Sequence, residues 1–122
     1  MSSSEIDKKT NLARNNQLEL LCFRLIPDGV MFAVNVFKVR ETVRFAELTE
    51  LPSSDPSIDG LLTLRDSIIP IVDLRKWLYS QNIPAHLAQK DKEVKNSDRQ
   101  IIVCEFNEVL VGIKIFKADY IL

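Results

Sequence analysis

Apolar residues along the chain gather in short runs, separated by residues that are typical of turns. A dense apolar run covers 18–26, Pro27-Asp28-Gly29 follows it, and a second run covers 30–34. Proline fixes φ near the value that turns need, and glycine takes a positive φ without steric cost. This spacing therefore predicts an antiparallel hairpin with the positive φ at Gly29.

The middle of the chain predicts a second pair of strands. Segments 60–64 and 67–72 are rich in Ile, Leu, Val and Thr, and a tight turn at Arg65-Asp66 joins them. Asp73 follows and predicts a short helix over 74–79, because its carboxylate can accept a backbone N–H at the helix start.

The segment before these strands carries two patterns at once, because its valines recur at helical spacing and also alternate as in a strand. We expect a helical turn over 36–39 and a strand from Glu41. The next segment, 51–56, holds two prolines and two serines and interrupts the sheet.

The C-terminal part predicts strands over 100–106, 109–115 and 118–122. Residues 80–99 are mostly polar and predict a mobile surface loop, and 1–16 predict a flexible N-terminal arm. Parallel α/β folds need helices of about ten residues or more between strands, and the pattern predicts none. The expected class is all-β with short helices, as a small barrel or sandwich.

Composition narrows the classes of function. The 122 residues include 16 basic and 17 acidic side chains, for a formal charge of -1, so the chain lacks the basic excess of a nucleic-acid binder. No apolar run approaches the roughly 20 residues that span a bilayer, which excludes direct membrane insertion. The N-terminus is polar rather than a secretory signal, which favours the cytoplasm. Cys22 and Cys104 are expected to be reduced and buried.

Residues for catalysis are scarce. His86 is the single histidine, the two cysteines lie far apart, and Gly29, Gly60 and Gly112 stand alone. A metal site needs several close ligands, and a nucleotide-binding loop needs clustered glycines. The carboxylate pair Asp55/Asp59 is expected to lie in turns. The sequence thus predicts a binding protein that is not an enzyme, with no metal and no cofactor.

Glu41 and Arg65 are the candidate binding residues, because each is a charge set in a strongly apolar stretch. Arg65 at a turn tip can present a rigid fork to a carboxylate of a partner. The alternative is that both are simply exposed charges, paired with each other for little energy.

The segment Gly60-Leu-Leu-Thr-Leu-Arg-Asp-Ser-Ile-Ile-Pro-Ile-Val-Asp-Leu-Arg75 resembles the signature of the CheW-like domain. That signature has a Gly, two apolar positions, Leu-Arg-Gly, an apolar pair, and then Pro, two positions of Val or Ile, and Asp-Leu-Arg. The upstream segment ending in Val39-Arg-Glu41 and the strand around Gly112 extend the resemblance over about 18–122. The lead-in from Asn15 and the run Asp73-Leu-Arg-Lys-Trp-Leu78 look more like CheV than plain CheW.

The resemblance implies a non-enzymatic adaptor built from two small five-stranded, SH3-like barrels. Such domains link chemoreceptors at their cytoplasmic tip to the regulatory domain of the histidine kinase CheA, in arrays at the membrane. By this resemblance Val39, Glu41 and Gly60 contact the kinase, and Arg65, with Asp66 beside it, contacts the receptor.

Three departures from the family pattern change these expectations. Asp66 replaces a Gly, so we expect Asp66 to take the positive φ of the turn and to place a negative charge beside Arg65. Phe116 replaces an Asp. The chain also stops early, so 17–122 are expected to form a C-terminally truncated coupling domain without a receiver domain and its phosphoacceptor.

This shortening has a structural consequence. We expect the barrel built from about 34–78 to be complete and the other barrel to lack strands. An open barrel exposes a sheet edge, which predicts a homodimer through that edge or poor solubility. Two other readings are a regulatory-domain fragment of a CheA-type kinase and a generic SH3-like protein-binding module.

Overall fold

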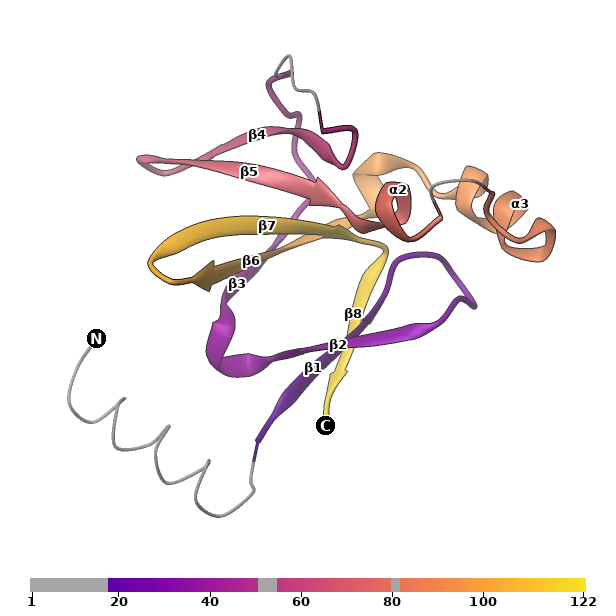
Figure 1. The fold of residues 1–122 in the computed structure, drawn as a ribbon, viewed down its shortest axis with the longest axis horizontal. Helices are drawn as coiled ribbons and strands as arrows, with labels where there is room; N and C mark the ends of the chain where they lie inside the picture. The colour runs from indigo at the N-terminus through magenta and orange to yellow at the C-terminus, as the bar shows by residue number, and fades with distance from the viewer. Residues whose placement is uncertain (1–17, 51–54, 80–81) are drawn as a thin grey trace.

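The computed structural model describes residues 18–50, 55–79 and 82–122. In this part of the chain the strands form two antiparallel or mixed sheets, and the two α-helices lie at one end (Figure 1). The strands are β1 (Leu20–Arg24), β2 (Met31–Asn35), β3 (Val39–Arg44), β4 (Ile58–Leu64), β5 (Ser67–Asp73), β6 (Gln100–Phe106), β7 (Val109–Ile115) and β8 (Lys117–Ile121). The helices are η1 (Val36–Lys38), α2 (Leu74–Leu78), α3 (Ala85–Glu93) and η2 (Asn96–Asp98).

The smaller sheet has the order β2-β1-β8, and the predicted hairpin of β1 and β2 is confirmed. Its turn is closed by the Gly29 amide, which donates to the Ile26 carbonyl at 2.9 Å. The expected positive φ at Gly29 is wrong, because Asp28 takes it, at 61°. Pro27 occupies the preceding position, as in turns that place the positive φ one residue after proline.

The larger sheet has the order β3-β6-β7-β5-β4, with β5 and β7 parallel. It closes into a barrel where Thr49 pairs with Leu61 of β4 through two backbone hydrogen bonds of 2.9 Å. The prediction that residues 34–78 alone complete a barrel is therefore wrong. The barrel also needs β6 and β7, which come from the C-terminal part of the chain.

β6 lies between the two apolar clusters of the molecule, because both of its faces are apolar. Ile101 and Val103 point into the barrel, where they pack with the buried Leu62, Ile69 and Ile71. Ile102 and Cys104 point the other way and pack in a second cluster against the smaller sheet. A strand that is buried on both faces reads as a continuous apolar run, which is the sequence pattern of β6.

The smaller sheet is open, in agreement with the expected incomplete second barrel. Within the described residues, β8 pairs on one side with β1. The end of β8 and the residue after it leave large apolar surfaces in water, because Tyr120 is 52% exposed, Ile121 58% and Leu122 71%.

The expected loop over 80–99 is wrong, because α3 and η2 occupy most of it. Leu87 is the one buried residue of α3, so this helix lacks the apolar stripe by which amphipathic helices are recognised. Asp91 supplies the second anchor of α3, through ion pairs with Arg75 and Arg99.

Candidate functional site

Arg65 and Glu41 form a two-pronged ion pair across the mouth of the barrel. Nη1 of Arg65 donates to Oε2 of Glu41 at 2.9 Å, and Nη2 donates to Oε1 at 3.1 Å. Two parallel N–H···O bonds fix the orientation of the guanidinium as well as its position. The structure thus brings the two candidate residues together, in agreement with the alternative prediction that they pair with each other.

The turn between β4 and β5 positions Arg65. Arg65 itself takes the positive φ of this turn, at 53°, so the expectation that Asp66 takes it is wrong. The favoured two-residue hairpin turns require a positive φ at their first central position, which here is Arg65. Asp66 follows as an exposed residue, and no ion pair of its carboxylate occurs in the described part of the chain.

A bulge in β3 positions Glu41. Val39 pairs with Cys104 and Glu41 pairs with Val103, so the register shifts between them at Arg40. Cys104 and Val103 face opposite sides of β6, and the two β3 residues do the same. Val39 therefore packs against the core between the sheets, whereas Glu41 reaches the barrel mouth. Without the bulge, residues two apart would share one face.

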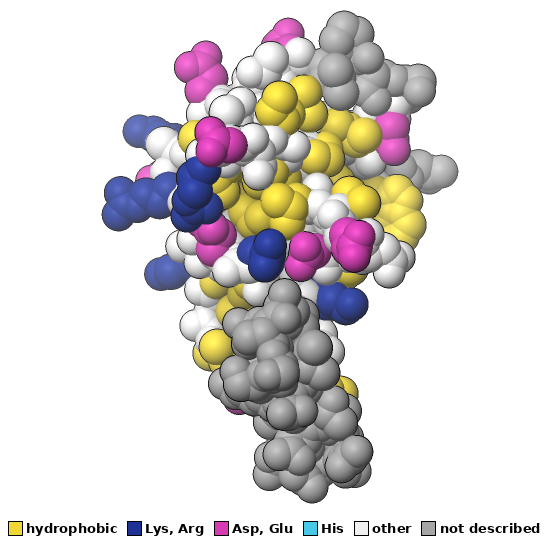
Figure 2. Space-filling model, turned by 90° about the vertical axis from the view of Figure 1, so that its left-hand side faces the viewer, with side chains coloured by type: hydrophobic (Ala, Val, Ile, Leu, Met, Phe, Trp, Pro, Cys, Tyr) yellow, Lys and Arg dark blue, Asp and Glu magenta, His cyan; other side chains and the backbone are white. Residues whose placement is uncertain are grey.

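The mouth of the barrel is a hollow of about 310 Å³. Its lining combines charges at the rim with apolar side chains below them: Arg40, Glu41, Leu64, Arg65, Ser67, Ile69, Val103 and Leu110. Figure 2 looks onto this side of the molecule and shows apolar side chains exposed between basic and acidic ones. A surface of this kind suits a protein partner that offers both apolar and charged groups.

The ion pair keeps both groups charged but holds them weakly. The hydrogen bond from Arg65 lowers the pKa of the Glu41 carboxyl, and the same bond to Glu41 raises the pKa of the Arg65 guanidinium. The Arg65 side chain is 71% exposed, and exposed ion pairs are screened by water. A carboxylate on a partner can therefore compete with Glu41 for the guanidinium.

Gly60 lies away from this pair, at the place where the barrel closes. A Cβ at Gly60 would lie 2.8 Å from the Thr49 carbonyl oxygen and 3.0 Å from Cβ of Leu48. Gly60 is thus needed for the close approach of the returning chain to β4, whatever else it contacts.

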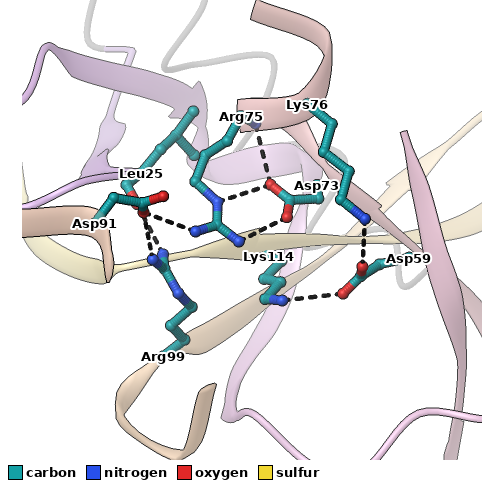
Figure 3. A network of polar contacts seen from close by, with 8 residues as sticks. All are labelled: Leu25, Asp59, Asp73, Arg75, Lys76, Asp91, Arg99 and Lys114. Atoms are coloured by element: carbon teal, nitrogen blue, oxygen red, sulfur yellow. Dashed lines mark hydrogen bonds and ion pairs between the residues drawn. The ribbon is translucent and has the colours of Figure 1, made fainter. Parts of the chain in front are cut away.

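A network of buried charges links the barrel to α3 and to the smaller sheet (Figure 3). Asp73 caps α2 as predicted, since Oδ1 accepts from the Arg75 amide at 3.1 Å. Its carboxylate also accepts two bonds from the Arg75 guanidinium. Oδ1 of Asp91 accepts from both Arg75 and Arg99, each at 2.7 Å. These residues bind one another and give α3 its place.

A second cluster surrounds Asp59, which lies in β4 and not in a turn as expected. Its carboxylate accepts from Lys76 and from the buried Lys114, each at 3.0 Å. The Lys114 ammonium also lies 4.8 Å from the centre of the Phe45 ring. Sequence reasoning missed this cluster, although a lysine between two isoleucines of an apolar strand was a visible signal.

Neither reactive thiols nor metal ligands form a site in the described residues. Cys22 and Cys104 are free and buried, and burial raises the pKa of the Cys104 thiol to about 11, which disfavours the reactive thiolate. Residues 18–50, 55–79 and 82–122 hold no cluster of three potential metal ligands. They also contain no helix long and apolar enough to cross a membrane.

Comparisons with known proteins agree with the fold and the signature. The family model of the CheW-like domain matches residues 19–121. The chemotaxis protein CheV1 of Helicobacter pylori is 40% identical over 99% of this chain, and CheV2 of the same organism is 37% identical over 97%. The chain spans about two fifths of the length of these relatives, because it covers 39% of each.

A solved structure shows the same fold. The crystal structure of the scaffolding protein TtCheW from Thermoanaerobacter tengcongensis superimposes with a TM-score of 0.67 at 24% identity, covering 86% of this chain and 60% of that chain. Fold and signature together define a non-catalytic scaffold domain. The chain belongs to the CheW-like domain family, and its similarity to CheV1 and CheV2 agrees with the coupling domain of CheV proteins.

Proposed function

We propose that this chain couples chemoreceptors to the histidine kinase CheA in the cytoplasm, at membrane-associated receptor arrays, with 17–122 as the coupling domain. The observation that carries this proposal is the Arg65–Glu41 pair at the mouth of an apolar-floored hollow. The Arg65 guanidinium is oriented and exposed. It can therefore exchange Glu41 for a carboxylate of a partner, and it does not have to be buried before the partner binds. The chain contributes no chemical step, and the signal passes as a change in contacts.

The family resemblance divides the surface between two partners. Val39, Glu41 and Gly60 are proposed to contact the regulatory domain of CheA, and Arg65 with Asp66 to contact the cytoplasmic tip of the receptor. Because Glu41 and Arg65 hold each other at 2.9 Å, the two proposed contacts adjoin. A partner that withdraws one member of the pair also changes what the other member offers.

Calorimetric titration of this chain against the isolated regulatory domain of a cognate CheA tests the kinase contact. We expect saturable binding that Glu41→Lys weakens at least about tenfold, because a like charge then faces Arg65 and the partner loses its acceptor. Glu19→Lys is the matched control, since Glu19 is exposed and lies outside the hollow. Circular dichroism establishes that each variant is folded. A folded chain that does not bind, or equal losses in both variants, would contradict the proposal.

The receptor contact has a separate test. Arg65→Ala should weaken binding to a receptor cytoplasmic fragment while leaving most of the affinity for the CheA regulatory domain. Arg65→Lys separates the fork from the charge, because an ammonium cannot form the two parallel bonds. If Arg65→Lys bound the receptor fragment as tightly as the wild type, the oriented guanidinium would not be the contact.

A further inference from the structure

A second hollow, of about 500 Å³, lies at the end of the molecule that carries α3. It is bounded by the β1–β2 turn, by the segment from α3 to η2, and by the junction of β7 and β8. Its lining residues are Pro27, Asp28, Lys90, Glu93, Val94, Asp98 and Phe116. In Figure 1 this end lies to the right, and the β4–β5 turn that carries Arg65 lies at the far left. The hollow is therefore separate from the site at the barrel mouth.

The floor of this hollow is apolar. Pro27, Val94 and Phe116 line it, and each is partly open to water. The Phe116 amide donates to the Arg24 carbonyl at 2.8 Å, which holds the start of this side chain against β1. An apolar group seated here would cover surface that is now exposed, which is a favourable transfer. By the resemblance to the CheW-like family, Phe116 stands where an Asp is expected, so the apolar floor depends on a residue at which this chain departs from that pattern.

The rim of the hollow is acidic. Asp28, Glu93 and Asp98 contribute carboxylates, and Lys90 contributes the one ammonium among the lining residues. Lys90 is already paired with Asp28. Glu93 accepts a hydrogen bond from the neutral Gln89 side chain, and within the described residues Asp98 takes part in no ion pair. Among the lining residues, the carboxylates of Glu93 and Asp98 are thus paired with no cation, while Lys92 and Lys95 lie outside the lining.

We propose that this hollow docks a linear segment of a partner protein in which an apolar side chain is flanked by Lys or Arg. The apolar side chain covers Phe116 and Val94, and the flanking cations lie against Glu93 and Asp98. An ion pair between Lys90 and Asp28 joins α3 to the β1–β2 turn, so the two walls of the hollow are in contact with each other. This surface goes beyond the proposed coupling function and can be occupied while the barrel mouth is engaged.

An NMR titration of the 122-residue chain with two short peptides tests the proposal. The probe is the capped pentapeptide Gly-Arg-Leu-Arg-Gly, and the control peptide is Gly-Glu-Leu-Glu-Gly. We expect saturable amide shifts at Val94, Asp98 and Phe116 with the first peptide, weakening as salt is added, since the attraction is between exposed charges. The acidic peptide should bind at least about fivefold more weakly.

Two variants separate the acidic rim from the apolar floor. The double variant Glu93→Gln/Asp98→Asn should remove most of the preference for the basic peptide, and Glu19→Gln/Glu47→Gln, which loses the same charge elsewhere on the surface, should keep it. Phe116→Asp should abolish the shifts at Val94, even if the arginines of the peptide still contact the acidic rim.

Equal affinity for the two peptides, shifts spread evenly over the surface, or equal losses in the rim variant and its charge-matched control would each overturn the proposal. The titration needs neither CheA nor a receptor. Its failure is therefore distinguishable from a failure of the coupling function, which is measured with Glu41→Lys.

Discussion

The guanidinium of Arg99 donates to the backbone carbonyl of Leu25 at 2.8 Å. Arg99 directly precedes β6 of the barrel, and Leu25 directly follows β1 of the smaller sheet, so this bond joins the two sheets. Arg99 is 1% exposed and also binds Asp91 of α3. One side chain thus connects α3 and β6, which are near in the sequence, to the end of β1, which lies 74 residues from Arg99.

Removal of Arg99 should therefore destabilise the whole domain. In Arg99→Met the Leu25 carbonyl loses its donor and Asp91 loses one of its two arginines, for an expected loss of about 2–4 kcal/mol in the free energy of unfolding. Urea denaturation followed by circular dichroism measures it. Asp98→Asn, an exposed neighbour, should stay within about 0.5 kcal/mol of the wild type. An equally mild effect of Arg99→Met would mean that water replaces its bonds.

Gly60 allows a test of whether a residue acts by contact or through the fold. A methyl group at this position would approach the Thr49 carbonyl oxygen to 2.8 Å, so Gly60→Ala should cost about 1–3 kcal/mol by pushing the closing segment off β4. Thr63→Ala, at an exposed position of the same strand, is the control. Thermal unfolding measures the stability, and calorimetry measures binding to CheA per folded molecule. Loss of binding without loss of stability would indicate a direct contact.

Asp66 should weaken attraction between Arg65 and an acidic receptor surface. Asp66→Gly and Asp66→Asn both remove the charge, and only the first adds backbone freedom, so a shared gain in receptor binding identifies the charge as the cause. We expect a gain of about two- to threefold in each, because exposed charges interact with about 0.2–1 kcal/mol. Titration with a receptor cytoplasmic fragment measures the gain, and no gain in either variant would contradict this role of Asp66.

Asp59 predicts a defined loss of stability in acid. Burial alone raises the pKa of Asp59, but the bonds from Lys76 and Lys114 outweigh it and hold this pKa below its usual value of 3.8. A carboxyl with a depressed pKa contributes stability that is fully present above the unfolded pKa and is lost as the pH falls through the folded one. The stability difference between the wild type and Asp59→Asn should therefore be constant above about pH 5 and shrink below 3.8.

Urea denaturation at a series of pH values measures this difference. Asp98→Asn serves as the control, because its carboxylate is exposed and contacts neither lysine. A difference between the wild type and Asp59→Asn that stayed constant down to about pH 2 would show that the two lysines do not depend on the charge of Asp59.

The local elements of this fold were readable from sequence because local rules determine them. Turn residues and apolar alternation located the hairpins, and the carboxylate of Asp73 located α2. The sequence did not show which strands form each barrel. Pairing between β5 and β7 joins segments about forty residues apart, and no local pattern specifies this pairing. α3 escaped detection for a related reason. Its anchors are Leu87 and the ion pairs of Asp91, which a helical periodicity does not reveal.

The candidate site was likewise predictable only in part from the sequence. Glu41 and Arg65 stood out as charges in apolar stretches, and their contact was an alternative that the structure confirms. The opposite directions of Val39 and Glu41 could not be predicted, because a bulge of one residue reverses the facing of a strand and leaves the composition unchanged. The same holds for the turn, where the positive φ moved from the permissive Asp66 to Arg65 because the turn geometry requires it at the first position.

In the part of the chain that the structure describes, β8 is an edge strand, which predicts that the 122-residue chain self-associates. β8 pairs with β1 on one side, and the exposed Tyr120 and Ile121 lie along it. An apolar edge strand offers unpaired N–H and C=O groups to a second copy. Light scattering after size exclusion should show a mass that rises with protein concentration. Ile121→Lys should shift the chain toward the monomer, since charged side chains on edge strands oppose pairing, whereas Thr63→Lys on β4 should not. The measurement should cover about two decades of concentration around the micromolar affinity of a weak dimer. A monomer mass over this whole range would contradict self-association through β8.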